Sequence, residues 1–174
     1  MTATAVRVNT AAYATTHVAT NVLQSIRQIV REAGLSTDYL LGRWDTLELG
    51  IATWLSSRHL QKLTLEIWDP TKQAGRDLVG RFDFAIAYGY YADGDGDLWL
   101  DPDTVSYAVR RAGAIPSRCT YRVIAKNAPG AATVAGWSGT SYRSTAGFTE
   151  HATGTALGGG SLGVGLSYYT SSGA

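Results

Sequence analysis

Residues 63–90, LTLEIWDPTKQAGRDLVGRFDFAIAYGY, decide the fold that the sequence predicts. Apolar residues occupy every second position in 63–68, and the same two-residue period returns in 81–90. That period is typical of strands that bury one face. Residues 69–77, DPTKQAGRD, separate the two runs and have the composition of a turn. The stretch therefore predicts an antiparallel hairpin with one face against a hydrophobic core.

Helical patterns precede this hairpin. From about 13 to 33, apolar residues recur at intervals of three and four, and Gly34 follows as a stop signal. A short helix is expected after Thr37, which is placed as an N-cap. Another is expected after Asp45, with Glu48 three residues on as in a capping box.

Further elements follow the hairpin. Asp101 and Pro102 have the composition of a helix start, and Gly113 predicts its end. A third strand is expected over 119–126, CTYRVIAK. This order of elements predicts an α+β fold in which helices pack on one sheet.

Length and charge bound the class of protein. The chain has 174 residues, with 15 Lys and Arg against 14 Asp and Glu. That length suits one domain over residues 1–174. The balanced charge gives no indication of nucleic acid or an anionic membrane as a direct partner. No apolar run approaches the roughly 18 residues of a membrane-spanning helix, and the N-terminus lacks the apolar block of a secretory signal, so we expect a cytoplasmic protein.

The C-terminal quarter has a different composition. Residues 128–174 contain 11 of the 20 glycines and only two Asp, Glu, Lys or Arg residues, Arg143 and Glu150. Glycine makes such a segment costly to order alone. Its spaced aromatic residues favour strands that dock on other elements, although disorder remains an alternative. These aromatic residues are Trp137, Tyr142, Phe148, Tyr168 and Tyr169.

No motif indicates catalysis or a cofactor. The single cysteine, Cys119, can form neither an intramolecular disulfide nor a cysteine zinc cluster, and is expected to be a buried thiol. The glycines of 158–163 have the spacing of a dinucleotide-binding loop, but no acidic residue follows them. The acidic run 93–97 lacks the Gly and Glu that a calcium loop needs further on. We therefore expect no cofactor, no metal and no catalytic residue.

Five stretches resemble bacterial HORMA-domain proteins, specifically those encoded beside the synthases of cyclic-oligonucleotide antiphage signalling (CBASS). They are distributed along the chain to about residue 150 and are THVATNVLQSIRQIV (16–30), TWLSSRHLQKLTLEIWDP (53–70), YGYYADGDGDLW (88–99), YAVRRAGAIPS (107–117) and VAGWSGTSYRST (134–145).

The resemblance implies a HORMA-type core sheet and a mobile C-terminal safety belt. The belt wraps around an extended peptide, the closure motif, which adds a strand to the sheet. By this resemblance, 13–127 form the core, 128–174 the safety belt and 1–12 a flexible N-terminal segment. Strand 120–126 offers the edge for the peptide. The implied peptide-binding residues are Thr120, Tyr121, Arg122, Val123, Ile124, Trp137, Tyr142, Arg143, Tyr168 and Tyr169.

The resemblance also implies protein partners. In the family, the peptide-bound form activates a cGAS-like (cyclic-GMP–AMP-synthase-like) nucleotidyltransferase, and an AAA+ ATPase remodeller engages the N-terminus and resets the switch. Some relatives share their operon with a second HORMA protein. In this chain the ATPase would engage the N-terminal segment through Thr2, Ala5, Arg7 and Asn9.

The hypothesis from the sequence is a non-enzymatic peptide-binding switch. Two alternatives from other classes stay open. One is a small metal-dependent enzyme that uses Asp93, Asp95 and Asp97 with a histidine. The other is a structural subunit whose glycine-rich tail exchanges between protomers.

Overall fold

The computed structural model describes residues 3–88, 102–159 and 162–171, and the side chains of 15–88, 102–153 and 162–171. Its helices are α1 (Ala3–Glu32), α2 (Asp38–Gly42), α3 (Trp44–Ser56) and α4 (Pro102–Ala112). Its strands are β1 (Leu60–Trp68), β2 (Leu78–Tyr88), β3 (Thr120–Asn127), β4 (Phe148–Gly159) and β5 (Leu162–Ser171). None of the helices in these ranges combines the length and apolar character needed to cross a membrane.

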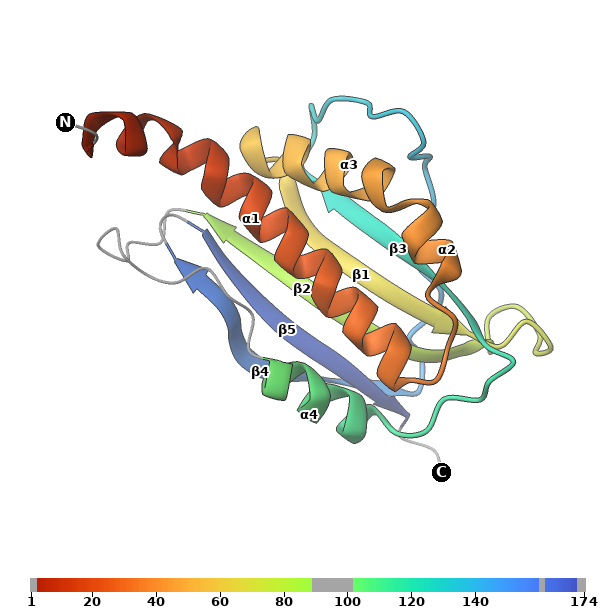
Figure 1. Cartoon of the computed structure of the whole chain (residues 1–174). Coiled ribbons are helices and arrows are strands. Elements are labelled where there is room, and N and C mark those ends of the chain that lie inside the picture. The colour runs from red at the N-terminus through yellow and green to blue at the C-terminus, as the bar shows by residue number, and fades with distance from the viewer. Residues whose placement is uncertain (1–2, 89–101, 160–161, 172–174) are drawn as a thin grey trace.

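The strands form one antiparallel sheet in the order β3-β1-β2-β5-β4, and the helices lie on one of its faces (Figure 1). The predicted α+β fold is confirmed. In the predicted hairpin, Leu63 lies opposite Phe84 and Leu65 opposite Phe82. All four side chains are fully buried in a core shared with α1, α3 and α4. The two-residue period thus identified the strands and their core face.

The opposite face of the hairpin is also buried, which the sequence did not predict. Thr64 and Glu66 have no exposed surface, and Asp83 is almost as buried. Part of the C-terminal region crosses this face on its way to β4, as the contacts below show. Polar side chains mark this face as solvent-facing in a sequence, whereas here they form an internal network.

Two predicted helix starts differ from the structure. α1 begins at Ala3 rather than near residue 13, so its ribbon continues through most of the segment expected to be flexible, and in Figure 1 it extends past the strands. α3 begins at Trp44, and the predicted capping box of Asp45 is wrong. Glu48 instead accepts hydrogen bonds from Thr20 and from the Trp44 indole.

The described part of the C-terminal region contains the expected strands. β5 pairs with β2, and β4 pairs with β5 at the far edge of the sheet. Val164 and Leu166 of β5 belong to the core. The region therefore divides into a core hairpin, 148–171, and residues 128–147, which run outside β3 and which we call the crossing segment.

Candidate functional site

β3 is one edge of the sheet, and among the described residues its outer side has no strand partner. On its inner side, Val123 lies opposite Leu65 of β1. On its outer side, the backbone hydrogen bonds include none from 120–126 to residues 131–147, all of which the structure describes. An unpaired edge presents N–H and C=O groups that can pair with a further strand.

The crossing segment is anchored first on α3. The indole Nε1 of Trp54 donates to the carbonyl of Ala132 at 2.7 Å. The indole Nε1 of Trp137 donates to the carbonyl of Thr46 at 3.0 Å. The two indole rings meet edge to face, with centroids 4.9 Å apart. This anchor combines hydrogen bonds with aromatic packing, so it fixes both position and orientation.

Two glycines make room for this anchor. A Cβ at Gly50 of α3 would collide with the Trp137 indole. A Cβ at Gly136 would come within 2.5 Å of Thr46, and Gly136 has φ +89°, which other residues rarely adopt. The Gly136 carbonyl accepts a hydrogen bond from the Arg43 guanidinium at 2.8 Å.

A second anchor lies on the sheet face away from the helices. The buried Glu66 carboxylate accepts hydrogen bonds from the backbone N–H of Arg143 at 2.8 Å and from its guanidinium at 2.6 Å. That guanidinium also donates to Asp77 at 3.1 Å and lies 3.7 Å from the centre of the Trp68 ring. Burial lowers the pKa of Arg143, but its bonds to the two carboxylates prevail and raise this pKa above the usual value.

Arg122 joins β3 to both Glu66 and the crossing segment. Its Nε donates to Glu66 Oε1 at 2.9 Å. Its two terminal nitrogens donate to the Thr140 hydroxyl at 2.8 Å and to the Ser141 carbonyl at 2.7 Å. The crossing segment is therefore connected to β3 through a side chain, which leaves the β3 main chain free at its outer edge.

A buried charged cluster extends this network across β2 and β5. Arg81 Nε lies 2.9 Å from Asp83 Oδ1, and Asp83 also accepts hydrogen bonds from Thr64 and Tyr169. Burial raises the pKa of Asp83, but these bonds and the Arg81 charge prevail and hold it below its usual value. Burial and the bond to Asp83 raise the pKa of the Tyr169 hydroxyl. The Tyr142 ring covers Arg81 at 4.4 Å.

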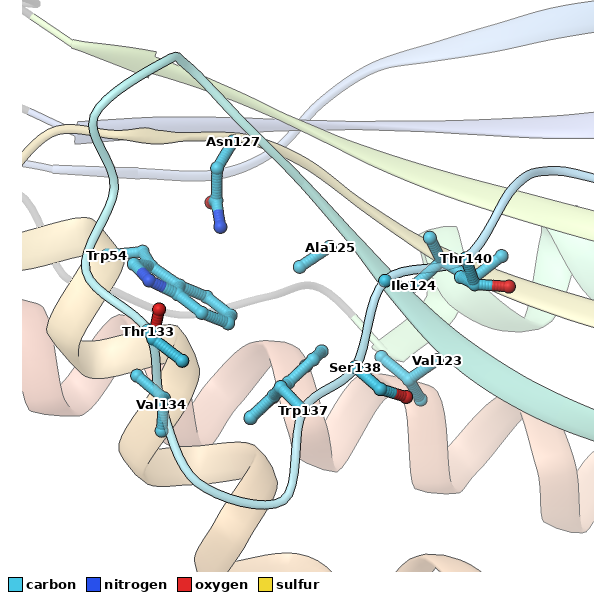
Figure 2. A pocket seen from close by; sticks show the side chains of 11 residues that line it. Trp54, Val123, Ile124, Ala125, Asn127, Thr133, Val134, Trp137, Ser138 and Thr140 are labelled. Atoms are coloured by element: carbon cyan, nitrogen blue, oxygen red, sulfur yellow. The ribbon is translucent and has the colours of Figure 1, made fainter.

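Between the two anchors, a groove follows the free edge of β3. It consists of two adjoining cavities of about 270 and 210 Å³, between β3, the α2–α3 region and the crossing segment. Figure 2 shows Trp54 and Trp137 across this space from the β3 side chains. We call it the edge groove. Both cavities are lined by Val123, Trp137, Ser138, Gly139 and Thr140.

The structure brings four of the ten predicted peptide-binding residues to the edge groove. Arg122, Val123, Ile124 and Trp137 line the edge groove. Tyr142 and Arg143 lie instead on the outer sheet face, as part of the second anchor.

The other predicted site residues lie elsewhere. Thr120 is exposed at the start of β3, and the Tyr121 hydroxyl donates to the Ser36 carbonyl. Tyr168 and Tyr169 lie in β5, which β1 and β2 separate from β3, so the structure does not bring them to the groove.

The remaining predicted site residues lie in segments that the structure describes only as backbone or does not describe. Thr2 lies outside the described residues, while Ala5, Arg7 and Asn9 lie in α1 without described side chains. Asp93, Asp95 and Asp97 also fall outside the described ranges. Where side chains are described, no three His, Cys, Asp or Glu side chains are grouped for a metal ion. Cys119 is a buried free thiol, as expected.

Sequence reasoning missed four residues that form the site. Arg43 and Gly50 were not singled out, and Trp54 and Glu66 were assigned only to helix and strand patterns. Gly50 had a usable signal, because glycine inside an amphipathic helix indicates a close approach by another group. Glu66 had no such signal, because its place on the polar side of an alternating strand predicts exposure to solvent.

Comparison with known proteins identifies the family. The model of Bacterial HORMA domain 2 matches residues 3–172. A chain of a mitotic checkpoint complex matches with TM-score 0.59 at 12% identity, covering 77% of this chain and 74% of that one. C. elegans HTP-2 bound to a HIM-3 closure motif matches with TM-score 0.53 at 16% identity, covering 79% and 72%.

A bacterial structure covers more of the chain. The E. coli MS115-1 CdnC:HORMA-deltaN complex matches with TM-score 0.58 at 12% identity, covering 90% of this chain and 86% of that one. A search of curated protein sequences finds no match. At such identities the structural matches show a shared fold. Because the family model spans nearly the whole chain, this chain belongs to the Bacterial HORMA domain 2 family.

Proposed function

We propose that this chain is a non-enzymatic, peptide-binding conformational switch of the cytoplasm. The observation that carries the proposal is the free outer edge of β3 inside an anchored crossing segment. A peptide strand at that edge would gain main-chain hydrogen bonds to β3, and residues 128–147 would close over it as a safety belt. The belt can release the peptide when its two anchors open and the hydrogen bonds from Arg43 and Arg122 break.

Structural neighbours support the choice of ligand. HTP-2 of C. elegans is bound to a HIM-3 closure motif in its structure. The present chain shares that fold, and its own edge groove lies beside an unpaired strand. We therefore propose a closure-motif peptide as the ligand, with Arg122, Val123, Ile124 and Trp137 in contact with it. Tyr168 and Tyr169 are left out of this site because they lie in β5.

The proposed output is activation of a cGAS-like nucleotidyltransferase in antiphage defence. Support comes from the E. coli neighbour, whose structure is a complex of a HORMA protein with CdnC. We further propose that an AAA+ ATPase engages residues 1–12 and opens the domain. The projection of α1 past the strands would make this end reachable (Figure 1). A second HORMA protein from the same operon is a further proposed partner.

The test is a peptide selection on the purified full chain with a randomised display library. We expect the selection to give peptides that bind the wild type. Their binding should be lost when their backbone amides are N-methylated at alternate positions. N-methylation removes the donors that strand addition needs. Together with this chain, a selected peptide should then stimulate a CdnC-like nucleotidyltransferase in a nucleotide-polymerisation assay.

Two results would contradict the proposal. A selection without binders would remove the peptide switch altogether. Binders that tolerate N-methylation at every position would show recognition by side chains alone, without strand addition.

A further inference from the structure

The two halves of the edge groove differ in chemistry. One half is walled by two tryptophans, Trp54 and Trp137, together with Val134, Val123 and Ala125, and has the polar side chains of Asn127 and Thr133 at its margin. The walls present apolar and aromatic surface, on which a large apolar side chain gains free energy by leaving water. This half is therefore suited to an aliphatic or aromatic residue of the peptide.

The other half is cationic. It is lined by Tyr39, Arg43, Leu47 and Arg122, besides the residues common to both cavities. Neither cavity has an aspartate or glutamate in its lining. Arg122 already uses its Nε and both terminal nitrogens on Glu66 and the crossing segment.

Arg43 remains available to a ligand. It is exposed, and within the described ranges its guanidinium makes one hydrogen bond, through one terminal nitrogen. The guanidinium also lies over the Tyr39 ring, 5.8 Å from its centre, which orients it along the groove wall. A guanidinium with free donors matches a carboxylate.

The register of β3 sets the spacing between the two halves. Val123 and Ala125 share the helix-facing side with Leu65 and Leu63, their partners in β1. Side chains of an added strand would enter the groove at every second position. From β3, the apolar half is lined by Val123, Ile124, Ala125 and Asn127, and the cationic half by Arg122 and Val123, so the two halves lie a few residues apart along the same strand.

We infer that the edge groove selects a peptide with a large apolar residue and an acidic residue two or four positions away, and that Arg43 reads the acidic residue. This inference rests on the proposed function and adds the chemistry of its ligand. It makes Arg43 a specificity-determining residue, although no sequence motif singled it out.

The first test is the residue preference at each position among the peptides that the display library selects on the full chain. We expect enrichment of Asp or Glu two or four residues from a Leu, Ile, Phe or Trp. Binders without this acidic preference, or with it only at odd spacing, would overturn the inference and leave the strand-addition proposal standing. A selection without binders would instead defeat the proposed function.

The second test is a charge exchange on one selected peptide, synthesised with Glu, Gln or Lys at the acidic position. Wild type is expected to bind the Glu form about fivefold more tightly than the Gln form, in the range of an exposed ion pair. Arg43→Glu should invert the order and prefer the Lys form. Because inversion needs direct pairing, loss of the Gly136 hydrogen bond alone cannot produce it.

Arg31→Glu is the matched control, since it reverses an exposed arginine on α1 that lines neither cavity. It should keep the wild-type order of the three peptides. If Arg43→Glu weakens the binding of all three peptides equally, Arg43 serves only to hold the crossing segment through Gly136, and its role in peptide selection is overturned.

Discussion

Glu66 shows how one residue controls the crossing segment. Its fully buried carboxylate accepts hydrogen bonds from Arg122 of β3 and from both the backbone and guanidinium of Arg143. A buried charge is tolerated only while it is paired, and removing one partner is strongly destabilising locally. The charge on Arg143 is therefore essential to the second anchor, although its long side chain lies outside the hydrophobic core.

Arg143→Glu tests this anchor by placing a carboxylate against Glu66 and Asp77. We expect faster amide exchange in 138–147 and about tenfold weaker retention of a selected peptide. The unfolding midpoint should change less, because Glu66 keeps its bond to Arg122 when the crossing segment detaches. Leu65→Ala, which empties a core position, should lower stability by about 2–5 kcal/mol and serves as the comparison. A midpoint for Arg143→Glu as low as that of Leu65→Ala would contradict the assignment.

Gly50→Ala tests the first anchor. The added methyl group would displace the Trp137 indole, whereas alanine itself favours the helix. We expect weaker peptide retention, similar to that of Trp137→Ala, and little further loss when both changes are combined, because both remove the same contact. Isothermal titration calorimetry of a selected peptide into each variant measures the affinity.

Gly42→Ala is the matched control, because a Cβ there meets no atom within 4 Å. It should bind peptide as the wild type does. Equal losses for Gly42→Ala and Gly50→Ala would show that Trp137 docking is irrelevant to retention.

At the scale of elements, the helices and strands that the sequence predicted correctly are those whose apolar residues recur periodically. β1, β2 and α4 were predicted because their apolar residues repeat at strand or helix intervals. The start of α3 was missed because Glu48 has partners on α1 and within α3, which no local motif reveals. The course of the crossing segment was out of reach, since its anchors join residues far apart in sequence, such as Trp137 with Thr46 and Arg143 with Glu66.

The turn between β1 and β2 carries a pH-dependent contribution to stability. Asp69 accepts hydrogen bonds from the Thr71 hydroxyl, the Thr71 backbone N–H and Arg118. These bonds, above all the one from the Thr71 hydroxyl, lower the pKa of Asp69 to about 2, although burial acts to raise it. A carboxyl group with a folded pKa below its unfolded value stabilises above the unfolded pKa. This stability is lost as pH falls from about 4 to about 2.

Asp69→Asn should therefore lower the unfolding midpoint at pH 7 more than at pH 2. Thermal unfolding at the two pH values, with Asp103→Asn as an exposed comparison, measures the difference. An equal effect of Asp69→Asn at both pH values would show that the carboxylate charge makes no contribution.

At the scale of the whole molecule, the C-terminal region has two distinct roles. The hairpin 148–171 completes the sheet, and Leu166 is fully buried in the core. The crossing segment contributes only Val134 to the buried core, and is otherwise held by its two anchors and by hydrogen bonds from Arg43 and Arg122. A belt that opens while the sheet persists needs this division, because local opening requires few buried contacts.

Leu166→Ala should consequently destabilise the fold about as much as Leu65→Ala, by about 2–5 kcal/mol. Val134→Ala, a buried position of the crossing segment, should cost less, because that segment can shift to fill the space. Urea unfolding of the three variants gives the order. A larger loss for Val134→Ala than for Leu166→Ala would place the crossing segment in the cooperative core.

The central claim is that a peptide adds a strand to the free edge of β3 beneath the crossing segment. Hydrogen exchange of the full chain, with and without a saturating selected peptide, tests it most directly. Strand addition should raise protection together in 120–127 and 131–143, while β5 changes little. Peptide binding that leaves β3 exchange unchanged would contradict strand addition at this edge.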